Sequence, residues 1–147
     1  MINRKIYISA AAPGFSRADL NNLLAVSRRN NAAAGLTGLL IFHQGRFFQI
    51  LEGARASVGA CYARIERDTR HTGLVLVENG SAQARAFDRW KMGFAHPGSL
   101  DPKLRDSILS IYDLVPPDSE GRGTDRRTRV AVRDFLAQFQ VLSRARG

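Results

Sequence analysis

The pattern of apolar residues is clearest in two runs, TGLLIFH and RFFQILEG, which flank Gln44-Gly45. They predict a β-hairpin with strands over 36–43 and 46–52 and the glycine in a two-residue turn. Side chains alternate between the two faces of a strand. Those of the second strand therefore divide into two sets, which are Phe47, Gln49 and Leu51 on one face and Phe48, Ile50 and Glu52 on the other.

Gln49 is the polar side chain in the middle of this second strand, between Phe48 and Ile50. Because large apolar residues lie around it on both faces, we expect the sheet to be covered on both sides. A buried amide without a hydrogen-bond partner costs about 1–3 kcal/mol. Another protein group or a ligand must therefore satisfy the Gln49 carboxamide.

A strand around 6–8 and a helix precede the hairpin. Ser16 is a suitable N-cap for this helix, and Asp19, three positions later, occupies the capping-box position. Eleven helical residues make almost three turns, so Asn31 falls about 20° from Leu20 on the apolar stripe. If the helix persists that far, Asn31 points inward, towards the sheet.

After the hairpin, the pattern predicts a second helix over 55–67, a polar loop over 68–71 and a fourth strand over 74–77. Gly80 is expected to turn the chain into a fifth strand at about 84–94. The order β-α-β-β-α-β-β predicts an α+β protein with a ferredoxin-like sheet and one added strand. Both helices follow strands and should pack on one face of the sheet.

Two further helical segments, 100–115 and 126–143, are the natural cover for the second face of the sheet. The segment between them, PPDSEGRG at 116–123, has the composition of a linker. The later helix carries an apolar stripe of Val132, Phe135, Leu136, Phe139 and Leu142. We expect this stripe to face the sheet and to leave the arginines of the same helix on its outer side.

A chain of 147 residues with 44% hydrophobic residues fits a single domain with an additional helical segment. No apolar run is long enough for a transmembrane helix, and the start, MINRKIYIS, lacks the apolar stretch of a signal peptide. Cys61 is the sole cysteine, so no internal disulfide can form, which suits a reducing compartment. We therefore expect a cytoplasmic protein that does not bind membranes.

The net charge of +9 results from 22 Lys and Arg against 13 Asp and Glu, and it permits nucleic-acid binding. Seven arginines and two aspartates in 121–147 place +5 of this charge in the last fifth of the chain. A solvated surface is the ordinary explanation, and docking of an acidic partner is the functional one. RNA-binding sheets of this fold expose stacking aromatics, and LVLV at 74–77 has none. A nucleic-acid-binding module is therefore only the alternative interpretation.

Enzymatic and metal chemistry find little support in the sequence. His43, His71 and His96 are scattered and have no metal-ligand spacing with Cys61. Cys61 lies on the apolar stripe of the second helix, where core packing explains it. No catalytic triad, paired carboxylates or Walker-type loop can be argued, so we expect neither a bound metal nor an enzyme.

Five residues from different elements indicate a binding site instead. Tyr7 lies in the first strand, Asn31 on the inner side of the first helix, and Gln49 in the central strand, with Trp90 and Met92 in the last strand. Each alone is explained as an ordinary core residue. Together they could meet a flat heteroaromatic ligand with alternating donors and acceptors, which the spacing does not identify.

Three segments carry a resemblance to a known family: SRRNNAAAGLTGLLIFHQGRFFQILEG (27–53), DTRHTGLVLV (68–77) and RAFDRWKMGF (85–94). They resemble the BLUF domain, the sensor of blue light using flavin, and IYISAA with Tyr7 fits the first strand of that family. The resemblance covers about 4–94, and the remainder is similar to the two C-terminal helices of short, single-domain BLUF proteins. It implies a photosensor domain over 1–95 and a helical output extension over 96–147.

The resemblance also implies a role for each matching residue. Tyr7 corresponds to the photoactive tyrosine, and Gln49 to the glutamine that bridges this tyrosine and the flavin. The residues expected around the flavin are Asn30, Asn31, Gln49, Asp68, Arg70 and His71, and those of the signalling strand are Trp90 and Met92. The flavin is non-covalent and lies between the two sheet-packed helices. It is expected to be FAD, although the family also accepts FMN and riboflavin.

By the same resemblance, Tyr7 gives an electron and a proton to the excited flavin, and Gln49 rearranges. A glutamine amide carries a donor and an acceptor at one end, so a flip or tautomerisation exchanges these roles. The result is a red-shifted state, relayed through the strand with Trp90 and Met92 to the C-terminal helices. A separate downstream signalling protein and a homo-oligomeric assembly are also implied.

Overall fold

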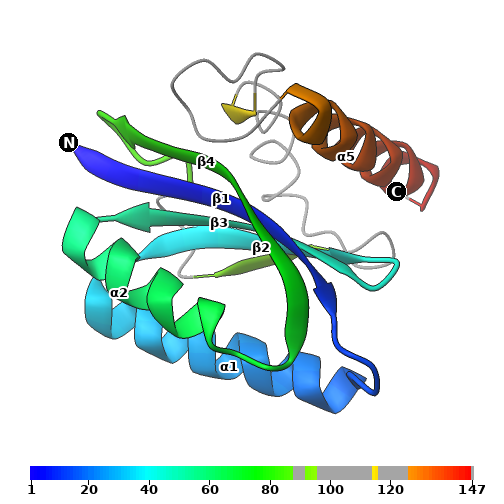
Figure 1. The fold of residues 1–147 in the computed structure, drawn as a ribbon, viewed down its shortest axis with the longest axis horizontal. Helices are drawn as coiled ribbons and strands as arrows, with labels where there is room; N and C mark the ends of the chain where they lie inside the picture. The colour runs from blue at the N-terminus through cyan, green and yellow to red at the C-terminus, as the bar shows by residue number, and fades with distance from the viewer. Residues whose placement is uncertain (88–91, 96–113, 116–125, 147) are drawn as a thin grey trace.

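The computed structural model describes residues 1–87, 92–95, 114–115 and 126–146. One sheet has the strand order β4-β1-β3-β2-β5 (Figure 1). The strands are β1 (Ile2–Ala11), β2 (Thr37–His43), β3 (Arg46–Gly53), β4 (His71–Ala82) and β5 (Gly93–Ala95). β1 pairs antiparallel with β3 and β4, β2 pairs antiparallel with β3, and β5 joins the outer side of β2 in parallel. The predicted α+β, ferredoxin-like plan with an added strand is confirmed.

Helices cover both faces of this sheet. Helices α1 (Arg17–Ala34) and α2 (Arg55–Glu66) lie on one side, and α5 (Arg126–Arg146) lies on the other (Figure 1). The predicted two-sided cover is therefore confirmed for these helices. Of the other predicted segment, 100–115, only Leu114 and Val115 belong to the described residues. In the described part of the chain, no helix combines the length and the apolar character needed to span a membrane.

Local sequence signals set both ends of α1. The Ser16 hydroxyl accepts a hydrogen bond from the Asp19 N–H, and the Asp19 carboxylate accepts one from the Ser16 N–H, at 3.1 and 2.9 Å. This capping box satisfies N–H groups that a helix start leaves unpaired. Gly35 ends the helix at a φ of 69°, a left-handed conformation that glycine adopts without steric cost. The helix thus persists through Asn31, which is only 1% exposed, as predicted.

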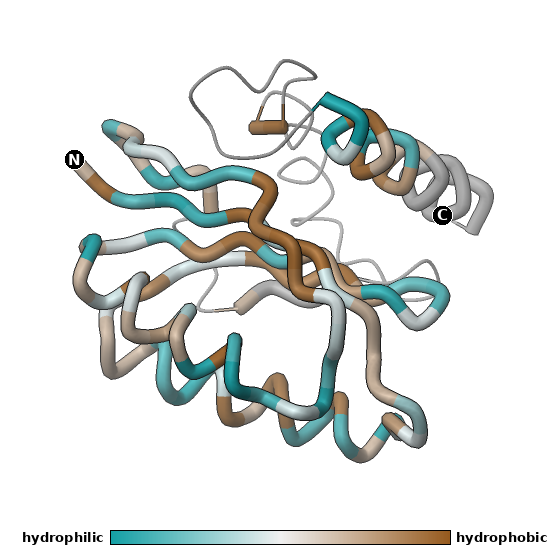
Figure 2. Tube along the Cα trace, viewed as in Figure 1, coloured by the Kyte–Doolittle hydropathy of each residue, from teal (hydrophilic) through white to brown (hydrophobic). Residues whose placement is uncertain are grey.

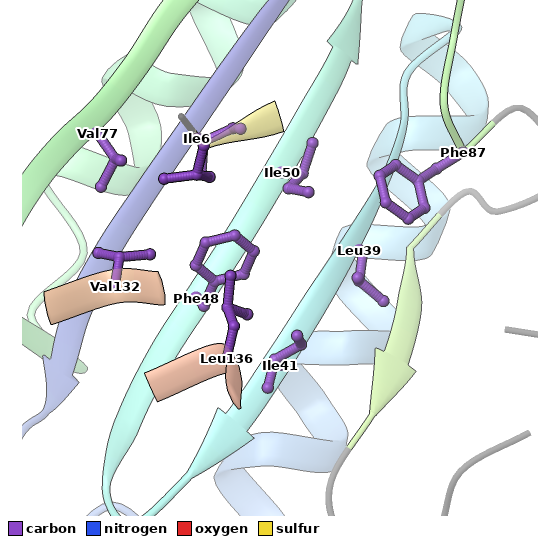
Figure 3. Close-up of a cluster of buried hydrophobic side chains, with 10 residues drawn as sticks. Ile6, Leu39, Ile41, Phe48, Ile50, Val77, Phe87, Val132 and Leu136 are labelled. Carbon is purple, nitrogen blue, oxygen red and sulfur yellow. The ribbon is translucent and has the colours of Figure 1, made fainter. Parts of the chain in front are cut away.

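The hairpin turns at Gln44 and Gly45, whose φ angles of 52° and 72° are both left-handed, as in a type I′ turn. The alternation predicted for β3 divides its side chains between two cores, with hydrophobic positions concentrated along the middle of the sheet (Figure 2). The outer core, next to α5, contains Ile6, Leu39, Ile41, Phe48, Ile50, Val77, Phe87, Val115, Val132 and Leu136 (Figure 3). The inner core, next to α1 and α2, contains Tyr7, Leu24, Leu36, Leu40, Phe47, Leu51, Val58, Cys61 and Met92.

Two predictions about the end of the sheet are wrong. Gly80 does not turn the chain, because β4 continues to Ala82 and pairs along the whole length of β1. The last strand is Gly93–Ala95, much shorter than the predicted 84–94. The N–H groups of Ala86 and Phe87 donate to the Glu52 carboxylate, so they do not pair with a neighbouring strand. Residues 88–91 of that prediction lie outside the described residues.

The expectation that the arginines of the last helix all face outward is also wrong. Arg129 is fully buried, and its Nη2 donates to the Val77 carbonyl at 2.7 Å and to the Glu78 carboxylate at 2.6 Å. Breaking such a buried pair by removing one partner is strongly destabilising. Arg133 donates to the Val115 carbonyl at 2.8 Å. These two arginines therefore attach α5 to the rest of the protein, whereas Arg127 is exposed.

Gly38 of β2 allows the central strands to approach each other, and this can be tested. A Cβ atom at Gly38 would lie 2.0 Å from the Ile50 carbonyl oxygen, which is backbone and cannot rotate away. We predict that Gly38→Ala lowers the free energy of unfolding by about 3 kcal/mol, as overpacking does. Gly59 in α2 is the control, because a Cβ there meets nothing within 4 Å.

Gly59→Ala should raise the free energy of unfolding by about 0.5–1 kcal/mol, since alanine is the better helix former. Urea denaturation of both variants beside the wild-type protein measures the two effects. Equal stability of the two variants would contradict the close approach at Gly38.

Candidate functional site

A cavity of about 220 Å³ lies between the inner face of the sheet and helices α1 and α2. Eight of the predicted site residues line it, namely Tyr7, Asn30, Asn31, Gln49, Asp68, Arg70, His71 and Met92. They come from three strands, one helix, the segment after α2 and the position just before β5, so the fold brings together residues that are far apart in the sequence. The ninth predicted residue, Trp90, lies outside the described residues.

Tyr7 and Gln49 are direct partners across the β1–β3 ladder, and both side chains are buried, at 2% and 8% exposure. Cβ atoms of such cross-strand partners lie about 4.5–5.5 Å apart. The Tyr7 ring also meets the Tyr62 ring edge-on, with 5.6 Å between the centroids. Burial raises the pKa of the Tyr7 phenol well above its usual value, and Cys61, Tyr62 and Asp68 add to this effect. The phenol is therefore a protonated O–H donor at neutral pH.

The Gln49 amide has a protein partner on the adjacent element. Its Nε2 donates to the Met92 sulfur at 3.4 Å, and the Met92 carbonyl accepts from Arg28 Nε of α1 at 3.0 Å. A thioether is a weak acceptor. A stronger acceptor in the cavity would therefore compete for the same amide N–H. The Gln49 carboxamide therefore has a protein partner, the Met92 sulfur, and it also borders a cavity in which a ligand can offer a second partner.

Asn30, Asn31 and Ser9 bring further polar groups to the cavity. The Asn31 carbonyl accepts from the Gly35 and Leu36 N–H groups, so the end of α1 holds this residue in place. Ser9, which sequence reasoning missed, is buried, and its Oγ has no hydrogen-bond partner. Its signal in the sequence was its position two residues after Tyr7, on the same face of β1.

The segment after α2 forms a charged margin of the cavity. Arg70 donates from Nε and Nη2 to the Asp68 carboxylate, with the shortest distance 2.6 Å, and this lowers the pKa of Asp68. His71 Nε2 lies 2.7 Å from the Ile65 carbonyl oxygen. Because a carbonyl only accepts, that nitrogen carries the proton. Arg64 is exposed and also lines the cavity, and sequence reasoning missed it.

The lining suits a flat polar heterocycle with an anionic extension. Side-chain amides of Asn31 and Gln49 and the unpartnered Ser9 hydroxyl offer donors and acceptors inside the cavity. Apolar walls are supplied by Phe15, Leu23, Val26, Leu40, Phe47 and Ile65. Guanidinium groups of Arg64 and Arg70 lie at the same cavity. A flavin has both of these parts, so the residues present fit one.

Comparisons with known proteins agree with this chemistry. The model of the family described as BLUF, sensors of blue-light using FAD, matches residues 2–93. Photoactivated adenylate cyclase subunit beta of Euglena longa is 38% identical over 120 residues, which cover 75% of this chain and 14% of that protein. The blue light- and temperature-regulated antirepressor BluF of Escherichia coli is 31% identical over 97 residues, covering 64% of this chain and 23% of that protein. The dark-state structure of the BLUF protein BlrB has 26% identity and a TM-score of 0.65, covering 89% of this chain and 96% of that one.

The raised pKa of Tyr7 predicts how stability depends on pH. A group with a raised pKa in the folded state contributes stability below its unfolded pKa, and the contribution is lost as the pH rises. We predict that Tyr7→Phe loses less unfolding free energy than the wild type between about pH 8 and about pH 11, on either side of the ordinary tyrosine pKa. Urea denaturation at both pH values measures the difference.

Tyr62→Phe is the control for this prediction. Tyr62 is less buried than Tyr7, and burial also raises its pKa. Its removal should therefore change the alkaline loss less than removal of Tyr7 does. If the Tyr7→Phe protein loses as much unfolding free energy as the wild type over this pH range, the raised pKa assigned to Tyr7 is contradicted.

Proposed function

The chain belongs to the BLUF family of blue-light sensors, and on this premise we propose that its inner cavity holds a flavin non-covalently and that Tyr7 and Gln49 carry the light response. The observation that supports this most strongly is their placement. They are cross-strand partners, both are buried, and both line one cavity. The protein then acts as a sensor without catalytic turnover.

We assign the polar edge of the ring to Asn31 and Gln49, with Asn30 and Ser9 beside them. Asp68, Arg70 and His71 then lie along the ring and its side chain. We propose FAD as the physiological cofactor, because it is the flavin that the family description names. The Arg64 and Arg70 guanidinium groups at the cavity also suit a phosphate-bearing flavin, FAD or FMN. Riboflavin has no phosphate and would gain nothing from them.

When bound, a flavin supplies absorption of blue light and, once excited, an electron acceptor. Tyr7 is the donor that we assign in this chain, because its phenol can lose an electron together with its proton and its side chain lines the cavity directly across the ladder from Gln49. Tyr7 is only 2% exposed in the inner core, and it lines the cavity. A flavin held there would therefore meet the phenol in a site of low dielectric.

Gln49 converts this event into a changed hydrogen-bond pattern. Its amide N–H now donates to Met92, a weak acceptor, and exchange of the amide ends would release that contact. Met92 immediately precedes β5, which pairs with β2 at the edge of the sheet. The change at Gln49 thus has a direct route to β5, and we place Trp90 on the same route.

The output is a separate downstream signalling protein in this proposal. Among the relatives, the named activities are those of a cyclase and an antirepressor, and both proteins are much longer than this chain. A homo-oligomeric assembly stays a prediction. The nucleic-acid alternative loses its physical basis, because α5 covers the face of the sheet on which Phe48 lies, and the Phe48 ring is fully buried.

The first test concerns the light response. Tyr7→Phe removes the donor, and Gln49→Leu removes the amide but keeps a side chain of similar size. Both variants should retain flavin and lose the reversible, light-induced red shift that we predict for the wild type. Absorption spectra in the dark and after blue light measure this. A normal red shift in either variant would show that its residue does not carry the response.

The second test concerns the form of the flavin. Arg64→Ala should weaken binding of FAD and FMN about tenfold, as expected for one charge-assisted hydrogen bond, and leave riboflavin binding unchanged. Arg67→Ala is the matched control, because Arg67 follows the same helix and is exposed but does not line the cavity. Equal losses for all three flavins, or equal losses in both variants, would contradict a phosphate contact at Arg64.

A further inference from the structure

Met92 is held at two points, and the light response proposed above uses only one of them. Its sulfur accepts a hydrogen bond from Gln49 Nε2 at 3.4 Å, and its carbonyl oxygen accepts one from Arg28 Nε at 3.0 Å. Arg28 belongs to α1, whereas Gln49 belongs to β3. Met92 therefore connects the central strand of the sheet directly with a helix that covers it.

The strand that follows Met92 gives its backbone little support. β5 has three residues, Gly93–Ala95, and pairs in parallel with β2 at the edge of the sheet. Parallel pairing is slightly less stable per residue than antiparallel pairing. The carbonyl that Arg28 holds belongs to the peptide unit between Met92 and Gly93, so this hydrogen bond attaches the start of β5 to α1.

The position of the Met92 sulfur depends on the position of this backbone. A methionine side chain has three rotatable bonds and adapts to its surroundings. The Met92 side chain packs in the inner core at 2% exposure, so these bonds have little freedom left. A shift of the carbonyl that Arg28 holds therefore moves the sulfur as well. The thioether is a weak acceptor, so a small shift is enough to break its contact with Gln49.

Arg28 also lies one helical turn before a residue of the flavin cavity. Asn31, three positions later on α1, lines the cavity, and it is the residue to which we assigned the polar edge of the ring. Arg28 itself is exposed and does not line the cavity. One helix thus holds both groups that compete for the Gln49 amide, the ring edge through Asn31 and the Met92 sulfur through Arg28.

We propose that Arg28 is a positioning residue for the light response: by holding the Met92 carbonyl on α1, it keeps the Met92 sulfur against the Gln49 amide. This inference rests on the proposed function, because the Gln49–Met92 contact matters to a light response only if Gln49 carries that response. After Gln49 has rearranged, the return to the dark state has to form this contact again. Arg28 keeps the sulfur in place for that step, so loss of its hydrogen bond slows the return.

Two substitutions of similar shape isolate the hydrogen bond. Arg28→Gln keeps an N–H donor, because the glutamine Nε2 is as many bonds from the backbone as the arginine Nε. Arg28→Glu places a carboxylate, which only accepts, at the same point, so the hydrogen bond to the Met92 carbonyl is lost. Arg29→Glu is the matched control, since Arg29 is the next residue of α1, is also exposed and undergoes the same change of charge.

The first readout is the Met92 methyl group. The chain has two methionines, of which Met1 is 89% exposed and Met92 is 2% exposed. The full chain is labelled with ¹³C in the methionine methyl groups, and its NMR spectrum is recorded in the dark, with bound FAD and without flavin. Met92→Leu identifies the buried signal. Arg28→Glu should shift or double this signal in both samples, whereas Arg28→Gln and Arg29→Glu should leave it at the wild-type position.

The second readout is the rate of dark recovery after blue light. Arg28→Glu should slow the recovery about threefold, which is within the range expected for one hydrogen bond, and the other two variants should not. Met92→Leu removes the sulfur. In that background Arg28→Glu should have no further effect on recovery, because residues that act through one contact are not additive.

Three results would overturn the proposal: a wild-type Met92 signal or recovery rate in Arg28→Glu, an equal change in Arg28→Gln or Arg29→Glu, or a full effect of Arg28→Glu on recovery in the Met92→Leu background. Failure of the proposed function gives a different pattern. A wild-type holoprotein with no red shift would refute the light response, whereas the Met92 signal of the flavin-free chain would still report whether Arg28 positions that residue.

Discussion

A carboxamide buried in the central strand of an apolar sheet is the constraint on which the rest of this structure depends. Gln49 must find donors and acceptors where the surrounding side chains offer few, and an unsatisfied amide would cost about 1–3 kcal/mol. The fold answers with a contact to the Met92 sulfur and a cavity lined by polar groups, and it places Tyr7 directly across the ladder from Gln49. Because the Gln49 amide has few hydrogen-bond partners, a change in one of them alters its remaining hydrogen bonds.

One strand serves two purposes because its side chains alternate. On the inner face of β3, Gln49 takes part in a site with a weak sulfur contact, which a modest change in partners can break. Glu52, of the opposite set, is saturated with strong donors. The amide to which we assign the light response and a carboxylate with several strong donors therefore lie three residues apart on one strand. On the other side of the sheet, α5 is attached by the buried pair of Arg129 and Glu78.

Regular features of this fold could be predicted from the sequence, and irregular ones could not. Period-two alternation and the capping box at Ser16 are local signals, so the two faces of β3 and the inward position of Asn31 followed from them. The strand predicted over 84–94 failed because a distant carboxylate, Glu52, takes the N–H groups that a strand would use. Arg129 was placed outside because its partner Glu78 is remote in the sequence, and burial of an arginine depends on that partner. Ser9 and Arg64 could not be predicted as cavity residues, because nothing in the sequence distinguishes them except that they lie near other site residues.

The most direct test of the central role of Gln49 is the light-minus-dark infrared spectrum of wild-type protein labelled with ¹³C at the glutamine side-chain carbonyl. Among the glutamines whose side chains are described, Gln49 is the buried one, and Gln44 and Gln83 are exposed. A rearranged Gln49 amide predicts a difference band that moves when the label is introduced and that vanishes as the protein returns to the dark state. A difference spectrum that is identical with and without the label would contradict the account, because the amide would then be a spectator of the light response.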